Sequence, residues 1–164
     1  MSGPAPESSV ARVEAALAER GLTCEIRRFP AGTRTSAEAA AAVGCAVSQI
    51  AKSLIFRAER SDRPVLVIAS GANRVDEAAV ASLIGEPIGR ADAAFVRART
   101  GFAIGGVAPV GHREAPIILI DRDLLEYETI WAAAGRPDSV FAIRPDDLVA
   151  VTGGRVAELK AEPG

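Results

Sequence analysis

The chain's only histidine and four of its fifteen glycines lie together in segment 100–112. Gly105 and Gly106 are adjacent there, and glycine lets a backbone turn sharply and approach a ligand closely. Pro109 fixes one dihedral angle and removes one amide donor. Such a segment can direct main-chain N–H groups at an oxyanion or a phosphate, and His112 adds a side chain that titrates near neutral pH. Two plainer interpretations remain open, namely a simple helix-to-strand connection and an exposed loop histidine.

Lysine is rare in this chain. Lys52 and Lys160 are the only lysines, and Lys52 lies inside the apolar run 50–56. A compact ammonium whose pKa is easily tuned suits such a position better than a guanidinium fork. The alternative is a lysine at the edge of the core, whose stem is buried while its ammonium reaches water. The pattern makes Lys52 a candidate site residue.

Length and composition indicate one soluble domain. The chain has 164 residues, 49 % of them hydrophobic, which is enough for a real core. No apolar stretch approaches the roughly 20 residues of a membrane-spanning helix, and residues 1–8 lack the features of a signal peptide. We therefore expect a cytoplasmic protein without a membrane segment. Cys24 and Cys45 lack metal-site spacing and companion histidines, so we expect buried free thiols, no metal and no cofactor.

The formal net charge of −2 argues against nonspecific coating of nucleic acid, yet charge is unevenly distributed. Segment 27–63 holds seven basic residues against three acidic ones. This excess permits a local phosphate contact, for which Arg34 and Arg57 are the candidates. A solvated arginine-rich face explains the excess about as well.

Start and stop signals predict short helices and strands without regular β-α-β alternation. Thr35 and Glu38 form a capping box, and Gly44 is a natural helix end. We expect helices from Ser8 or Ser9 to Gly21, over 35–44, 75–84, 92–99 and 145–153, and a single turn at 47–50. We expect strands over 24–29, 52–58, 65–70, 116–121 and 140–143, with 52–58 and 65–70 antiparallel. Segment 124–134 fits either state. The pattern favours an α+β or mixed-sheet domain over a doubly wound sheet.

Common cofactor and nucleophile motifs are absent. The glycines of segment 100–112 lack Gly-x-Gly-x-x-Gly spacing, and Lys52-Ser53 follows alanine rather than the glycine of a Walker motif. No serine stands in a Gly-x-Ser-x-Gly elbow. Dinucleotide binding and serine-nucleophile chemistry are therefore disfavoured.

Several separated segments together resemble the YbaK/ProX family, the free-standing relatives of the editing domain inserted in bacterial prolyl-tRNA synthetases. The resemblance rests on Thr35-Ser36-Ala37-Glu38-Ala39-Ala40, Gly44, segments 50–56 and 105–112, Asp121, Tyr127-Glu128-Thr129 and Ala134-Gly135. It covers residues 8–158 as one domain, with 1–7 and 161–164 as loose tails. It implies an α+β fold, with a mixed, mostly antiparallel, β-barrel-like sheet flanked by helices.

The resemblance implies hydrolysis in trans of the ester of mischarged aminoacyl-tRNA. Segment 101–112 is more similar to the ProXp-x group, which is linked to small aliphatic residues, than to the alanine-specific branch. This resemblance suggests tRNA-Pro carrying a small amino acid such as alanine or 2-aminobutyrate. The implied partners are this tRNA and a prolyl-tRNA synthetase, with no membrane, and the protein is expected to be a monomer or weak dimer. Three alternatives remain open: a noncatalytic module that binds a tRNA end or nucleotide, a Cys-tRNA(Pro) deacylase of the YbaK type, and a small-molecule hydrolase.

The same resemblance assigns site residues. It implies that Lys52 contacts the terminal phosphate or ribose and stabilises developing negative charge. It also implies that amides around Gly105 and Gly106 stabilise the oxyanion. His112 is expected to shape the pocket mouth rather than transfer a proton. The implied substrate-binding residues are Thr35, Asn73, Val107, Pro109, His112, Asp121 and Gly135, with Arg34 and Arg57 as tRNA contacts.

Overall fold

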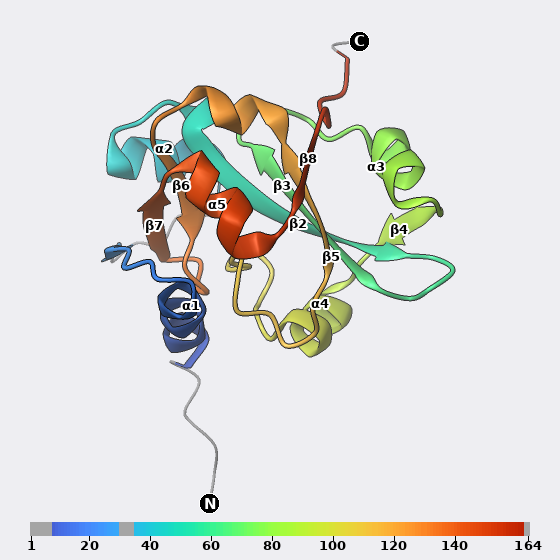
Figure 1. Cartoon of the computed structure of the whole chain (residues 1–164), viewed down its shortest axis with the longest axis horizontal. Helices are drawn as coiled ribbons and strands as arrows, with labels where there is room; N and C mark the ends of the chain where they lie inside the picture. The colour runs from blue at the N-terminus through green and yellow to red at the C-terminus, as the bar shows by residue number, and fades with distance from the viewer. Residues whose placement is uncertain (1–7, 30–34, 163–164) are drawn as a thin grey trace, which may run out of the picture.

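The computed structural model describes residues 8–29 and 35–162, which form one mixed sheet with helices on both faces (Figure 1). The helices are α1 (Ser8–Glu19), α2 (Ser36–Val43), α3 (Glu77–Ile84), α4 (Ala93–Thr100) and α5 (Pro145–Thr152), with 3-10 turns η1 (Val47–Gln49) and η2 (Arg122–Glu126). The strands are β1 (Ile26–Arg28), β2 (Ile50–Ala58), β3 (Pro64–Ser70), β4 (Ile88–Arg90), β5 (Ile117–Asp121), β6 (Ile130–Ala133), β7 (Ser139–Ile143) and β8 (Arg155–Ala157).

The sheet runs in the order β1-β7-β6-β2-β3-β5-β8, and β4 pairs with β2 beside this path. Four strand pairs are antiparallel, namely β1–β7, β6–β7, β2–β3 and β2–β4. Pairing is parallel between β2 and β6, β3 and β5, and β5 and β8. The expected α+β class and mostly antiparallel mixed sheet are confirmed. Among the described strands β1 and β8 end the path, so the sheet is open rather than closed into a barrel.

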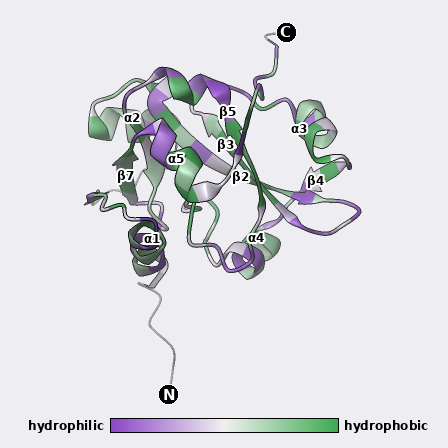
Figure 2. Ribbon diagram, in the orientation of Figure 1, coloured by the Kyte–Doolittle hydropathy of each residue, from purple (hydrophilic) through white to green (hydrophobic). Residues whose placement is uncertain are grey.

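Alternation along β3 divides the core into two layers. Leu66 and Ile68 belong to one buried cluster with residues of α1, α4 and α5. Val65, Val67 and Ala69 belong to a second cluster, which includes residues of α3. Because successive strand residues point to opposite faces, a strand that is apolar throughout must be covered on both. Figure 2 shows this hydrophobic centre and the hydrophilic turn that joins β2 to β3.

Local signals predicted most helix ends. Thr35 caps α2 with both hydrogen bonds of the capping box, and Gly44 ends it in the left-handed conformation. Asp92 caps α4, and Gly153 ends α5. The ambiguous segment 124–134 divides between η2 and β6, and the three-residue strands β4 and β8 were not predicted.

The two cysteines are free thiols, as expected, but the expectation that they are buried is wrong. Cys24 and Cys45 are both partly exposed. Each packs beside a buried cluster rather than inside it. Their partial burial still raises the pKa of both thiols, so a smaller fraction of each is in the reactive thiolate form than in a free cysteine.

Strand β2 is paired incompletely on one edge. β3 accompanies it from Ala51 to Arg57, whereas the opposite edge meets β6 only at residues 50–51 and β4 only at residues 56–58. The Gly71 N–H donates to the Ile50 carbonyl, so the backbone groups of Ile50 face β3. Because hydrogen-bonded positions alternate along an antiparallel pair, the backbone groups of Lys52 and Leu54 also face β3. The N–H and C=O groups of Ser53 and Ile55 consequently point to the open edge, between β6 and β4.

Candidate active site

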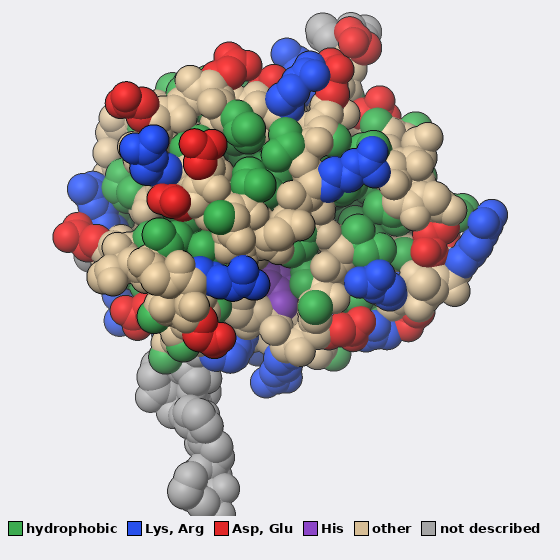
Figure 3. Space-filling model, viewed as in Figure 1, with side chains coloured by type: hydrophobic (Ala, Val, Ile, Leu, Met, Phe, Trp, Pro, Cys, Tyr) green, Lys and Arg blue, Asp and Glu red, His purple; other side chains and the backbone are tan. Residues whose placement is uncertain are grey.

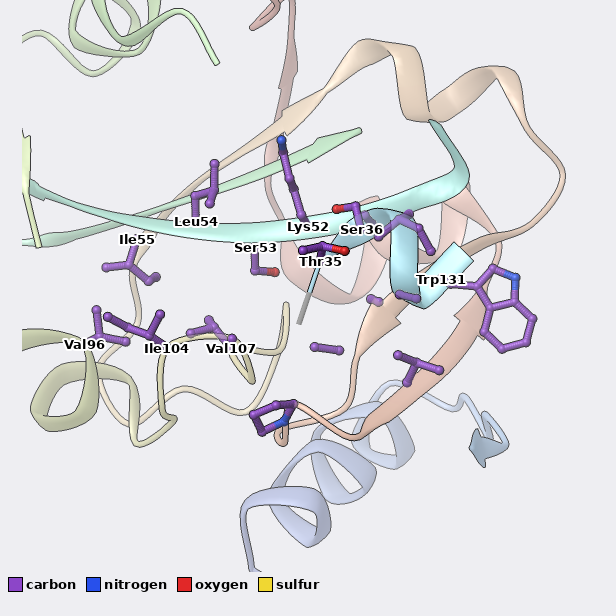
Figure 4. Close-up of a pocket in the computed structure, with 18 of the residues that line it drawn as sticks. Thr35, Ser36, Lys52, Ser53, Leu54, Ile55, Val96, Ile104, Val107 and Trp131 are labelled. Atoms are coloured by element: carbon purple, nitrogen blue, oxygen red, sulfur yellow. The ribbon is translucent and has the colours of Figure 1, made fainter. Parts of the chain in front are cut away.

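A pocket of about 770 Å³ surrounds the open edge of β2 (Figure 4). Its walls come from α2, α4, segment 104–107 and the β6–β7 hairpin, which are far apart in the sequence. Side chains from both faces of β2 line it, so the pocket continues around the strand edge. Figure 4 shows Lys52 and Leu54 on one side of β2, and Ser53 and Ile55 on the other.

One end of the pocket is apolar. Ile55, Val96, Ile104 and Val107 converge there (Figure 4). Ile104 is unusual for a large aliphatic residue because 59 % of it is exposed, which places it at the rim. An exposed aliphatic side chain beside an apolar hollow suits contact with a small apolar group of a ligand.

Lys52 lies on the other side of the strand, where its ammonium donates to the Asn73 carbonyl at 2.8 Å. Burial lowers its pKa below 10.5, while the negative charge of Asp121 opposes this shift. A half-buried ammonium held by one neutral carbonyl keeps donors for a further acceptor, since it has three. Lys52 can therefore contact an anionic or hydroxyl group of a ligand.

A buried network positions the carbonyl that holds Lys52. Asn73 Nδ2 donates to Asp121 Oδ2 at 2.9 Å and to Asp123 Oδ2 at 2.8 Å. The Ser70 N–H donates to the same Asp121 oxygen, and only 1 % of Asp121 is exposed. Neither Asn73 nor Asp121 lines the pocket. The structure places these two expected substrate-binding residues behind Lys52, where they hold its partner in place.

The glycine segment contributes backbone to the pocket. Gly105 and Val107 line it, and Gly105 has a φ of 91°, a conformation that favours glycine. The Gly106 N–H is occupied, because it donates to the Ala103 carbonyl at 2.9 Å. In the described part of the chain nothing accepts from the N–H groups of Gly105 and Val107. These two amides, rather than that of Gly106, are the available donors.

Pro109 and His112 lie elsewhere, in a second hollow of about 220 Å³ between the same loop, α1 and α5. His112 Nε2–H donates to the Ala108 carbonyl at 2.6 Å, and the ring packs edge-on against Phe102 with centroids 5.2 Å apart. In Figure 3 the single histidine shows at the bottom of a surface hollow. The structure thus separates His112 from the pocket that Lys52 and Val107 line.

The position of His112 predicts a pH dependence of stability. Burial lowers its pKa below the ordinary 6.5, and the nearby charge of Arg12 adds to this, against the opposing hydrogen bond to Ala108. The unfolded chain therefore binds the proton more readily than the folded chain. The free energy of unfolding contains the whole contribution of neutral His112 above pH 6.5, and it falls as the pH drops from 6.5 toward the lowered pKa. The loss should not exceed about 1.4 kcal/mol per pH unit.

Urea unfolding of the wild type and of His112→Leu between pH 5 and pH 8 measures this effect. The variant is expected to lose the part of the pH slope that lies below pH 6.5. Identical slopes in the two proteins would remove His112 as its source.

The other expected site residues divide between pocket and scaffold. Thr35 lines the pocket at the N-terminus of α2. Gly135 has a φ of 102°, and a Cβ there would lie 2.7 Å from the Ser9 carbonyl oxygen, so it permits close packing of α1. Arg57 forms an ion pair with Asp62 at 3.0 Å. Arg34 lies outside the described residues.

Several pocket residues were not identified from the sequence. Ser53, Val96, Ile104 and Trp131 all line the pocket. Trp131, the chain's only tryptophan, lies at the far end from Ile104, with the Arg27 guanidinium 4.8 Å from its ring centroid. Strand alternation around Lys52 could have indicated that Ser53 and Ile55 share the opposite face of the strand. Val96, Ile104 and Trp131 are distant in the sequence, and only the fold brings them to the pocket.

Within residues 8–29 and 35–162, no three His, Cys, Asp or Glu side chains gather as a metal site would require. In that same part of the chain, no helix has the length and apolar character to cross a membrane.

The open mixed sheet, with a lysine- and glycine-lined pocket beside the incompletely paired strand β2, defines a small α+β domain. Residues 30–151 match the family model described as the aminoacyl-tRNA editing domain, and the chain belongs to this family. The resemblance inferred from the separated motifs is thereby confirmed.

Three individual relatives are similar to this chain, and the names of two of them refer to prolyl-tRNA synthetase or to a proline–tRNA ligase. A crystal structure of a proposed trans-editing enzyme for prolyl tRNA synthetase superposes with a TM-score of 0.89 at 43 % identity, covering 98 % of this chain and 100 % of that one. The uncharacterized protein YwhH of Bacillus subtilis is 31 % identical over 76 % of this chain and 78 % of its own length. A proline–tRNA ligase of Limosilactobacillus fermentum is 35 % identical over 57 % of this chain, which corresponds to 17 % of the ligase.

Proposed function

We propose that this protein is a trans-editing deacylase that hydrolyses the ester of mischarged aminoacyl-tRNA. The observation that carries the proposal is the pocket around β2, which combines an apolar end, a half-buried ammonium and the backbone N–H groups of Gly105 and Val107, from which no described residue accepts a hydrogen bond. An aminoacyl ester has a matching set of groups, namely a side chain, a nucleotide with phosphates and a carbonyl that becomes an oxyanion. Membership of the editing-domain family supports the same activity.

The chemistry requires little from side chains, since the ester is already activated. Water adds to the carbonyl carbon, the tetrahedral oxyanion forms, and the bond to the ribose oxygen breaks, releasing a free amino acid and a tRNA hydroxyl. The N–H groups of Gly105 and Val107 would stabilise the oxyanion, and in well-studied hydrolases one such donor contributes about 3 kcal/mol. Lys52 would contact the terminal phosphate or ribose and stabilise the negative charge that develops in the transition state. A hydroxyl of the substrate itself would orient the water, because His112 lies in the second hollow and Glu77, the one carboxylate among the described lining residues, is exposed.

Selectivity for a small amino acid follows from the apolar end of the pocket. Alanine and 2-aminobutyrate are the proposed substrates on tRNA-Pro. One methylene changes binding by only about 1–3 kcal/mol, so size alone gives overlapping specificities. Protection of correctly charged tRNA would then depend on the tRNA or on a prolyl-tRNA synthetase. Under this proposal the protein acts in the cytoplasm. We also propose that it is a monomer or a weak dimer.

Contact with the tRNA backbone is proposed for Arg34 and Arg57. Arg57 would have to exchange Asp62 for a phosphate, and exposed ion pairs of this kind are weak enough to exchange. The binding should therefore be weak and salt-sensitive.

The test is single-turnover deacylation by purified protein of one tRNA-Pro transcript charged in turn with proline, alanine, 2-aminobutyrate, serine or cysteine. Free aminoacyl esters serve as the control. Faster release of a noncognate amino acid than of proline supports the proposal, whereas equal activity on free esters would indicate a small-molecule hydrolase. Binding of the charged tRNA without any release would indicate a noncatalytic module.

A further inference from the structure

Arg12 of α1 is hydrogen-bonded to both ends of the glycine segment, residues 100–112. Its Nη2 donates to the Gly101 carbonyl at 3.0 Å, and its Nε donates to the Gly111 carbonyl at 3.2 Å. The guanidinium also lies 4.8 Å from the ring centroid of Phe102. One side chain therefore joins the start of the segment to its end. It comes from a helix that precedes residues 30–151, the part of the chain that matches the editing-domain model.

The two bonded positions fit closely around this side chain. Gly101 and Gly111 have φ values of 82° and 81°, which favour glycine. A Cβ at Gly101 would lie 2.6 Å from Arg12 Nη2, and a Cβ at Gly111 would lie 3.2 Å from the Arg12 carbonyl oxygen. The approach of α1 therefore leaves no room for a side chain at either end of the segment.

Hydrogen bonds to carbonyls, rather than an ion pair, account for the position of Arg12. Arg57, Arg99 and Arg136 each pair with a carboxylate, whereas no carboxylate pairs with Arg12 in the described part of the chain. Burial lowers the pKa of its guanidinium, and the positive charge of Arg113 adds to this shift. A guanidinium holds its donors in a rigid planar fork, which suits two acceptors that must keep a fixed separation.

α1 also supports the opposite wall of the pocket. A Cβ at Gly135 would lie 2.7 Å from the Ser9 carbonyl oxygen, so the β6–β7 hairpin packs directly on α1. The same hairpin meets the glycine segment, since a Cβ at Gly106 would lie 3.0 Å from Pro137 Cδ. Figure 4 shows α1 on the far side of this hairpin from Lys52. The helix thus lies behind both walls of this part of the pocket.

The glycine segment needs such support because its residues after α4 form no helix or strand. The N–H groups of Gly105 and Val107, the available oxyanion donors, lie between the two points that Arg12 holds. Donors of this kind stabilise an oxyanion only when they are accurately placed, and a displacement of about 1 Å can cost about 100-fold in rate.

We propose that Arg12 is a positioning residue for deacylation, which holds the glycine segment so that the N–H groups of Gly105 and Val107 meet the oxyanion. The proposal rests on the deacylase function proposed above and adds to it a residue from outside the matched editing-domain region. Arg12 does not line the pocket, so it acts through the segment and not on the substrate. Its loss should slow bond breaking and leave substrate binding nearly unchanged.

The experiment compares the wild type with Arg12→Ala and Arg12→Lys on one tRNA-Pro transcript charged with alanine. At saturating protein, the single-turnover rate is expected to fall about 10-fold or more in Arg12→Ala, because the hairpin still supports the segment in part. Arg12→Lys should remain at least about 5-fold slow, since one ammonium does not reproduce the fork. Millimolar guanidinium chloride should restore part of the rate of Arg12→Ala, whereas sodium chloride should not.

Binding is measured separately, with alanine joined to adenosine by a 3′-amide that cannot be hydrolysed. Its dissociation constant should change by less than about 3-fold in both variants, because the oxyanion forms only during the reaction. A role of Arg12 in substrate binding would instead weaken the analogue in proportion to the rate.

Two variants of the same helix are the controls. Val13→Ala removes a fully buried side chain next to Arg12 but leaves both hydrogen bonds, and it should lower the midpoint of urea unfolding. Arg20→Ala removes the same charge from an exposed position. Both controls should keep the wild-type rate within about 3-fold, since neither side chain holds the glycine segment.

A further measurement does not depend on turnover. The N–H groups of Gly106 and Arg113 donate to carbonyls of the segment and of α4, so their hydrogen exchange reports how firmly the segment is held. Exchange of both should be at least about 5-fold faster in Arg12→Ala, while that of the Gly44 N–H at the end of α2 should be unchanged. If Arg12→Ala does not fold, Arg12→Lys decides the rate and the exchange.

The outcomes separate the two proposals. A wild-type rate or wild-type exchange in the Arg12 variants overturns the role of Arg12 and leaves the deacylase function standing. An equal loss of rate in Val13→Ala, or a parallel loss of analogue binding, overturns it as well. Absence of release by the wild type overturns both proposals.

Discussion

Replacement of Lys52 by alanine is expected to lower the single-turnover deacylation rate by about 100-fold or more, the scale on which loss of one well-placed charge-stabilising donor acts. The cost to folding should be small, because the side chain is only partly buried and its ammonium makes one hydrogen bond, to the Asn73 carbonyl. The variant should therefore keep a melting temperature near that of the wild type. Lys52→Arg should not restore the rate, since a planar guanidinium is larger and directs its donors differently.

The chain provides a matched control for this substitution. Lys160 is the only other lysine, and it is exposed beyond β8, so Lys160→Ala removes the same charge away from the pocket. Rates are measured at several protein concentrations to separate binding from turnover. Full activity of Lys52→Ala at saturating protein would remove Lys52 from the mechanism.

Gly106→Ala is expected to have the second largest effect. A Cβ at this position would lie 2.9 Å from Arg136 Cα and 3.0 Å from Pro137 Cδ, and neither is the flexible end of a side chain. The glycine segment must therefore move away from the β6–β7 hairpin and carry the N–H groups of Gly105 and Val107 with it. We expect a rate loss of about 100-fold together with destabilisation of about 1–3 kcal/mol.

Two other glycines separate the possible causes. Gly105→Ala adds a Cβ that meets only Pro137 Cγ, at 3.9 Å, so it tests strain at a φ of 91° within the pocket. Gly85→Ala adds the same kind of strain, at a φ of 82°, in open space between α3 and β4. Urea unfolding and single-turnover rates are compared across the three variants. A Gly106→Ala protein with the wild-type rate would show that the position of this segment is unimportant for hydrolysis.

Structural features that depend on a few neighbouring residues were predictable from the sequence. The capping box of Thr35 and Glu38 and the left-handed Gly44 require only local spacing, and both occur as expected. The β2–β3 hairpin follows from two apolar runs and a polar turn. The three-residue strands β4 and β8 have too few residues to show a period, so only their tertiary pairing defines them.

The site was predictable in part for the same physical reason. The unusual composition around Lys52 and Gly105 indicated residues that do lie in one pocket. The neighbouring His112 was grouped with them by proximity in the sequence, yet the chain turns at Pro109 and carries it to a different hollow. Arg12 has an ordinary sequence context, and its contact with both ends of the glycine segment is evident only in the fold.

The pairing of β2 with β6 also affects how the protein folds. It joins Ile50 to Trp131, and the pocket exists only once such distant segments have met. Pairings of this kind require closure of long loops, which slows folding and delays them relative to local hairpins. Trp131 lies at this junction, with Arg27 of β1 over its ring, so its fluorescence should report the final assembly of the sheet. In refolding experiments, ligand binding should appear together with the slow tryptophan phase and not before it.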